Sequence, residues 1–153
     1  ERFTLRPMER RDASATLESW TEDEAAAEML NMTPHRWSIA EQADYFSKYQ
    51  SQRTHYLLGL FPHEQTEPIG LFIVRLRPED SVMLVTHLLG NKGWRGTGAT
   101  REGSLGIFEF FFDKLDYKKA INSSEKRADV VVMGIMADEW RARRHGTRTL
   151  RRP

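Results

Sequence analysis

The chain has 153 residues, of which 39% are hydrophobic and 29% charged, so it can form one domain with a buried core. Its formal net charge is +1, which creates no overall field that would draw the protein to nucleic acid or to a membrane surface. It contains no cysteine, and this excludes a disulfide, a thiolate nucleophile and a cysteine-ligated metal site.

The N-terminal third is predicted to be mainly helical after one short strand. Residues 3–6 favour a strand, and residues 10–20 and 22–30 have the apolar spacing of two helices. Ser38 and Glu41 stand three positions apart, which is the spacing of a capping box at the start of a further helix. The apolar stripe of that helix consists of Ile39, Ala43, Phe46 and Tyr49.

Strands dominate the middle of the chain. Short polar links join three β-rich runs, which predicts an antiparallel meander of residues 55–61, 69–76 and 81–89. A long helix is predicted over residues 98–115, with an apolar stripe of Leu105, Phe108, Phe112 and Leu115. Residues 129–136 favour a last strand and residues 137–144 a short helix. This order predicts an α+β fold, in which helices flank a central mixed and mostly antiparallel sheet.

A glycine-rich loop links the third run of the meander to the long helix, and it contains Gly90, Gly93, Gly96 and Gly98. The N-terminus of a helix carries unpaired amides and the positive end of the dipole, and glycines let the backbone approach a phosphate closely. Arg95 adds a fixed charge that suits the same ligand. The loop therefore predicts a phosphate site. A plain connector that only caps the helix would share this pattern.

Two common nucleotide-binding motifs do not fit this loop. A P-loop needs Gly-Lys-Ser/Thr after its first glycine and spacer, whereas Gly98 is followed by Ala99 and Thr100. A dinucleotide fingerprint needs G-x-G-x-x-G early in a βαβ unit. Here Arg101 stands at the third glycine position, and the preceding strands are predicted to be antiparallel.

The segment Arg95-Gly96-Thr97-Gly98-Ala99-Thr100 resembles the phosphate loop of the GNAT superfamily of acyl-CoA N-acyltransferases. That loop reads Arg/Gln-x-x-Gly-x-Gly/Ala after the fourth strand, so Thr100 stands where Gly or Ala is usual. Further segments are similar, in the same order, to the branch that contains the ribosomal-protein N-terminal acetyltransferases. These segments are residues 3–7, 68–70, 93–98 and 129–140.

The resemblance implies an N-acetyltransferase that uses acetyl-CoA as co-substrate. An amine would attack the thioester directly, and His87, on the strand before the loop, is the candidate base that takes its proton. Backbone amides at the end of that strand would hold the thioester oxygen. Glu102, in the first turns of the long helix, is expected to compensate the helix dipole. The expected acetyl-CoA-binding residues are Leu88, Leu89, Trp94, Arg95, Gly96, Thr97, Gly98, Ala99 and Thr100.

The interval between the long helix and the last strand is short for this family. Members of the family have a strand, a helix and another strand there, which need about 30 residues, and this chain has only residues 116–128. Asn122, Ser123 and Ser124 are interpreted as a remnant of the start of that helix. We therefore expect residues to be missing near 116–129. The domain prediction is a single acetyltransferase domain over residues 1–144, followed by a basic tail over residues 145–153.

The leading functional hypothesis is transfer of an acetyl group to a primary amine, either of a small molecule or of a protein N-terminus. The alternative is a non-catalytic CoA-binding or RNA/ribosome-binding module on the same fold, suggested by Thr100 and by the C-terminal arginines. Under the leading hypothesis nucleic acid is not an expected partner, and a second copy of the chain is a candidate partner. No metal site is expected, because the histidines are scattered at His35, His55, His63, His87 and His145.

The sequence contains no apolar run near the roughly 20 residues that a membrane-spanning helix needs. The segment 1–7 also lacks the apolar core of a signal peptide. We therefore expect a soluble protein of the cytoplasm with no membrane partner.

Overall fold

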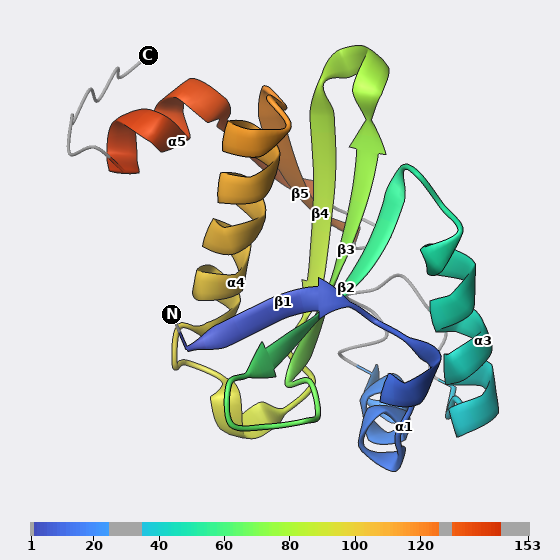
Figure 1. The fold of residues 1–153 in the computed structure, drawn as a ribbon. Coiled ribbons are helices and arrows are strands. Elements are labelled where there is room, and N and C mark those ends of the chain that lie inside the picture. The colour runs from blue at the N-terminus through green and yellow to red at the C-terminus, as the bar shows by residue number, and fades with distance from the viewer. Residues whose placement is uncertain (1, 25–34, 126–129, 145–153) are drawn as a thin grey trace.

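A computed structural model of the chain describes residues 2–24, 35–125 and 130–144 (Figure 1). The predicted helix over residues 22–30 lies mostly outside the described residues, and the predicted basic tail at 145–153 lies wholly outside them. Within the described ranges, no helix is both long and apolar enough to cross a bilayer.

One six-stranded sheet forms the centre of the fold, with its strands in the spatial order β1 to β6. They are β1 (Phe3–Pro7), β2 (His55–Pro62), β3 (Gly70–Arg77), β4 (Val82–Leu88), β5 (Lys119–Glu125) and β6 (Val130–Met136). Neighbouring strands are antiparallel, except that β4 and β5 are parallel. The predicted α+β fold is confirmed, and the three predicted β-rich runs form the meander β2–β3–β4.

The interpretation of residues 122–124 as the remnant of a helix is wrong, because they lie in strand β5. Asparagine is depleted in strands and serine is not among the residues that favour them, so the local pattern gives little sign of this strand. The parallel ladder with β4 and the antiparallel ladder with β6 provide its backbone partners and override that preference. The expectation that residues are missing near 116–129 stays a prediction.

Helices cover both faces of the sheet (Figure 1). The pair α1 (Ala15–Glu22) and α3 (Ile39–Gln50) lies on one side, and α4 (Ala99–Phe108) and α5 (Ala137–Arg144) lie on the other. The capping box before α3 is confirmed. The Glu41 amide donates to Ser38 Oγ at 3.3 Å, and the Ser38 amide donates to the Glu41 carboxylate at 2.8 Å. Three short 3-10 turns cover Arg10–Asp12, Pro78–Asp80 and Lys92–Trp94.

The helix predicted over residues 10–20 begins later than expected, at Ala15. The Asp12 carboxylate accepts a hydrogen bond from the Glu9 amide at 2.8 Å and two from Arg6 at 2.7 Å. These contacts close a separate 3-10 turn, after which Ala13 and Ser14 are extended. A short polar side chain that bonds nearby backbone competes with a helix in this way.

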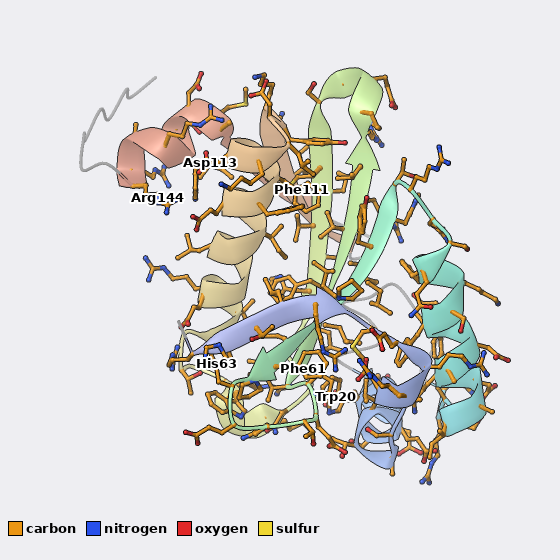
Figure 2. All side chains as sticks on the ribbon, in the orientation of Figure 1. Trp20, Phe61, His63, Phe111, Asp113 and Arg144 are labelled. Carbon is orange, nitrogen blue, oxygen red and sulfur yellow. The ribbon has the colours of Figure 1, made fainter. Side chains whose placement is uncertain are left out.

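The two faces of the sheet bury two separate hydrophobic clusters. The cluster under α4 and α5 includes Phe72, Phe111, Phe112 and Trp140, and the cluster under α1 and α3 includes Trp20, Phe61 and Leu88. In Figure 2, Phe111 points from the end of the long helix towards the sheet, and Trp20 and Phe61 lie on the side of α1. The sheet is therefore buried on both faces, which holds its central strands in one register.

The long helix is not α-helical to its end, because residues Glu109–Lys114 form a π-helix. This change alters which residues face the sheet. Phe111 and Phe112 are buried, whereas Leu105 and Leu115 of the predicted stripe are 41% and 47% exposed. The prediction of an apolar stripe is therefore wrong at those two positions. At Leu115 the reason is the π-helical segment before it, whose turn holds more residues than an α-helical turn.

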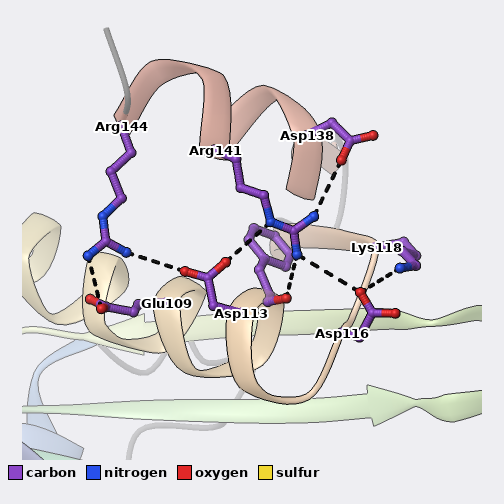
Figure 3. Close-up of polar contacts among 8 residues, drawn as sticks. Glu109, Asp113, Asp116, Lys118, Asp138, Arg141 and Arg144 are labelled. Atoms are coloured by element: carbon purple, nitrogen blue, oxygen red, sulfur yellow. Dashed lines mark hydrogen bonds and ion pairs between the residues drawn. The ribbon is translucent and has the colours of Figure 1, made fainter.

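Charged side chains fasten α5 to the π-helix (Figure 3). Arg141 donates to the carbonyl oxygen of Phe112 at 2.6 Å and to the Asp113 carboxylate at 3.2 Å. Arg144 donates to Glu109 at 3.0 Å and to Asp113 at 3.3 Å. Arg141 therefore satisfies a partly buried backbone carbonyl, whereas Arg144 forms exposed ion pairs and lies 5.2 Å from the centre of the Trp140 ring.

We predict that Arg141→Met lowers the free energy of unfolding by about 1–2 kcal/mol, because a hydrogen bond from a charged donor to a partly buried carbonyl is lost. Arg144→Met is the matched control, since exposed ion pairs contribute about 0–1 kcal/mol. Urea denaturation measures both. Equal losses in the two variants would contradict a special role for the Phe112 carbonyl.

Candidate active site

Two glycines of the loop after β4 have backbone conformations that other residues rarely adopt. The φ angle is +76° at Gly96 and +83° at Gly98. A Cβ atom at Gly96 would meet nothing within 4 Å, and one at Gly98 would meet only the Arg2 guanidinium at 3.9 Å. The backbone conformation, and not crowding by the protein, therefore requires glycine here, and the space beside the loop is open.

Gly98 is the N-cap residue of α4 and has no side chain that could cap the helix. The first helical hydrogen bond runs from the Glu102 amide to the Gly98 carbonyl at 3.0 Å. The amides of Ala99, Thr100 and Arg101 precede it and have no partner within the helix. Together with the positive end of the helix dipole, they form a site suited to an anion.

The other side chains of the predicted site surround this helix start. Thr97 turns its hydroxyl back to the Trp94 carbonyl at 2.7 Å, and the Trp94 ring packs edge-on against Phe3 at 5.3 Å. Arg95 is exposed, Thr100 is half-buried and Ala99 is buried. Residues 94–100 thus run from the end of a 3-10 helix through a turn into the start of α4, and the charge of Arg95 lies at the surface.

The strand before the loop separates from its neighbour at the same end of the sheet. The ladder between β4 and β5 ends at the pair Val85–Asn122, although β4 continues to Leu88 and β5 to Glu125. We call this opening the β4–β5 seam. Leu88 packs into the cluster under α1, and Leu89 contacts the cluster under α4. Both residues therefore lie where the sheet opens, next to the glycine loop.

His87 lies on β4 beside the seam. It is directly opposite Phe72 on β3, so the two side chains share the face of the sheet that α4 covers. The two rings are 5.7 Å apart. Burial lowers the pKa of His87 from its usual value of 6.5, because removal from water disfavours the charged imidazolium. The ring is therefore neutral at pH 7, the state in which it can accept a proton.

A cavity of about 520 Å³ lies between α1 and the glycine loop. Its lining includes Trp20, Gly90 and Asn91, and its charged residues are two acids and two bases: Glu22, Asp23, Lys92 and Arg95. Trp20 fills the space beside Gly90, since a Cβ atom there would come within 1.9 Å of the ring. The cavity therefore adjoins the end of β4 on the side of α1.

One contact of the site has no local sequence signal. Arg2 bonds Glu102 and the Thr97 carbonyl, residues that stand 100 and 95 positions away in the chain. Only the pairing of β1 with β2 and the packing of α4 across β1 bring them together. Among the residues that the structure describes, no three His, Asp or Glu side chains converge as a metal site would require.

The structure thus combines a six-stranded mixed sheet, flanked by helices, with an uncapped helix N-terminus that is suited to an anion. A family model described as "Acetyltransferase (GNAT) domain" matches residues 2–144. The chain therefore belongs to the GNAT acetyltransferase family and is an acyltransferase. No curated protein matches the chain.

Solved structures with the same fold include several acetyltransferases. One is the spermidine N-acetyltransferase from Vibrio cholerae in complex with CoA and spermine, with 14% identity, a TM-score of 0.76 and coverage of 91% of this chain and 98% of that chain. The aminoglycoside acetyltransferase AAC(6')-Ib in complex with CoA has 17% identity, a TM-score of 0.72 and coverage of 93% and 99%. The ribosomal-protein-S5-alanine acetyltransferase from Vibrio fischeri has 10% identity, a TM-score of 0.69 and coverage of 92% and 96%. At such identities the likeness shows the fold.

Proposed function

We propose that this protein transfers an acetyl group from acetyl-CoA to a primary amine, by direct attack of the amine on the thioester. The acceptor is a small molecule or a protein N-terminus. The observation that carries the proposal is the start of α4, where uncapped amides and two positive-φ glycines adjoin the β4–β5 seam. The pyrophosphate of acetyl-CoA would fit the uncapped amides at the start of α4. The narrow chain that carries its thioester would fit the β4–β5 seam.

Each part of this site has a role that its geometry supports. The amides of residues 98–101 would bind the pyrophosphate, and the exposed Arg95 would add a charge that suits its oxygens. Amides near Leu88 and Leu89 would hold the thioester oxygen as negative charge develops on it. His87, kept neutral by burial, would accept the proton that the attacking amine loses, directly or through one water molecule. As the C–N bond forms, the C–S bond of the thioester would break, and CoA would leave as a thiolate that is protonated by solvent.

The acceptor amine would enter through the cavity beside α1. This cavity reaches Gly90 and Asn91, the residues that follow the end of β4, so an amine in it would approach the seam. Its carboxylates are in ion pairs, Asp23 with Lys92 at 3.0 Å and Glu22 with Arg36 at 3.7 Å, so a cationic amine would compete with these lysine and arginine side chains. The similar structures include a spermidine acetyltransferase and an aminoglycoside acetyltransferase, which supports small amines as the first acceptors to test.

Two measurements test the proposal. Isothermal titration with acetyl-CoA should show saturable binding below millimolar concentration, and a thiol-release assay should show turnover with spermidine, an aminoglycoside or a peptide with a free N-terminus. Absence of binding at millimolar acetyl-CoA would refute the proposal. Binding without turnover on any amine would favour the alternative, a non-catalytic CoA-binding module.

A further inference from the structure

Arg2 connects the first strand to the glycine loop through three groups of its own. Its amide donates to Glu102 Oε1 at 2.6 Å, and its Nε donates to Glu102 Oε2 at 2.9 Å. Its Nη2 donates to the carbonyl oxygen of Thr97 at 3.2 Å. The guanidinium also lies 4.9 Å from the ring centre of Phe3, whose ring in turn packs against Trp94. One side chain thus contacts both the loop and the first turn of α4.

The contact with Thr97 fixes the direction of a loop amide. The Thr97 carbonyl and the Gly98 amide belong to the same planar trans peptide, so they point in opposite directions. Because Arg2 holds the carbonyl, the Gly98 amide is directed away from Arg2, to the outside of the turn. At a φ of +83°, Gly98 offers little resistance to rotation of this peptide, so an external contact is needed to hold it.

The contact with Glu102 has an electrostatic consequence. A carboxylate in the first turn of a helix is favourable in the free protein, but it would repel a pyrophosphate bound to the same turn. The hydrogen bonds and charge of Arg2 lower the pKa of Glu102, so this carboxyl is ionised at neutral pH and its charge is balanced by the guanidinium. Without the guanidinium, the backbone amide of residue 2 would still donate to Glu102, but the ion pair would be lost and the negative charge of this carboxylate would remain beside the anion site.

We propose that Arg2 is a positioning residue for the pyrophosphate of acetyl-CoA. It orients the Gly98 amide through Thr97 and neutralises Glu102, and it does not itself take part in the acetyl transfer. This inference rests on the proposed function. The Arg2–Glu102 pair is expected to affect binding of the co-substrate more than stability. The Arg2 and Glu102 side chains are 52% and 28% exposed, so the pair should add little to stability, yet its loss should weaken binding of the co-substrate.

Three variants separate the two roles of Arg2. Arg2→Gln removes both, and Arg2→Lys keeps the charge but lacks the planar fork that reaches Glu102 and Thr97 together. Arg2→Gln combined with Glu102→Gln removes the unpaired carboxylate and leaves only the loss of orientation. Arg10→Gln is the matched control, because Arg10 forms an exposed ion pair with Asp44 at 3.0 Å outside the site.

The measurements are KM and kcat for acetyl-CoA and for S-acetylpantetheine, which lacks the pyrophosphate, together with calorimetric Kd for CoA and thermal unfolding. We expect Arg2→Gln to raise KM and Kd for the CoA forms about 10- to 100-fold, with kcat, the S-acetylpantetheine kinetics and Tm nearly unchanged. Arg2→Lys and the double variant should each recover part of the affinity, and Arg10→Gln should match the wild type.

The result that would overturn this inference is wild-type affinity for CoA in Arg2→Gln, or an equal loss with CoA and S-acetylpantetheine, which would indicate a general structural role. If the wild-type protein binds no CoA, the proposed function itself fails and the role of Arg2 fails with it. The two failures are distinguished by the wild-type titration alone.

Discussion

Gly98→Trp is expected to weaken the binding of acetyl-CoA at least 100-fold. At a φ of +83°, any side chain strains the backbone, and a left-handed conformation costs about 1–2 kcal/mol for a residue other than glycine. The indole would in addition occupy the open space beside the amides of α4, where the pyrophosphate needs close approach to the backbone. Isothermal titration with CoA measures the loss.

Gly93→Ala is the control for this variant, because Gly93 belongs to the same loop but has no positive φ. A Cβ atom there would meet only the Asn91 side chain, at 3.3 Å. Its affinity for CoA should remain within about threefold of the wild type. Circular dichroism and thermal unfolding would establish that both variants are folded. A folded Gly98→Trp with wild-type affinity would rule out the loop as the pyrophosphate site.

His87→Ala is expected to lower kcat about 100-fold or more, the usual contribution of a positioned general base, with little change in the affinity for acetyl-CoA. Burial lowers the pKa of His87 below 6.5, and only the neutral ring can accept a proton. In the wild type, activity should therefore be full above about pH 6.5, and it should fall as the pH decreases through this lowered pKa. That acidic limb should be absent from the residual activity of the variant.

The control for this prediction is His55→Ala, at the far end of β2 from the loop. His55 bonds the adjacent Thr54 hydroxyl at 3.0 Å and contacts no part of the candidate site. Its removal should leave kcat and the pH profile unchanged. If His87→Ala retains wild-type turnover between pH 6 and 9, a range chosen around the histidine reference value of about 6.5, another group takes the proton from the amine.

The parts of the fold that follow from local chemistry could be predicted from the sequence. The capping box of Ser38 and Glu41 and the glycine positions of the loop are examples, because a cap or a positive φ depends on a few adjacent residues. Strand β5 could not be predicted, since its partners in β4 and β6 determine its conformation. The exposure of Leu115 was missed for a related reason, since the π-helix before it is not visible in the apolar spacing of the sequence.

The candidate site likewise has one part that could be predicted from the sequence and two that could not. The loop of residues 94–100 could be found from its pattern, and the structure gathers it at the start of α4 as expected. The contact between Arg2 and Glu102 could not, because it joins residues 100 positions apart through the pairing of β1 with β2. The opening of the sheet between β4 and β5 is a relation between two strands, so no local pattern shows it, and the sequence pointed to it at Leu88 and Leu89 only through the family resemblance.

Because of the β4–β5 seam, backbone amides in different parts of this sheet should exchange hydrogen with solvent at different rates. A strand end that lacks a neighbour on one side leaves backbone amides open to water. Such amides exchange hydrogen for deuterium through small local openings. The paired half of β4, near Met83 and Val85, would exchange only with larger openings of the domain. A molecule that inserts into the seam acts as the absent neighbour strand, so its binding should be visible as slowed deuterium uptake at residues 86–89.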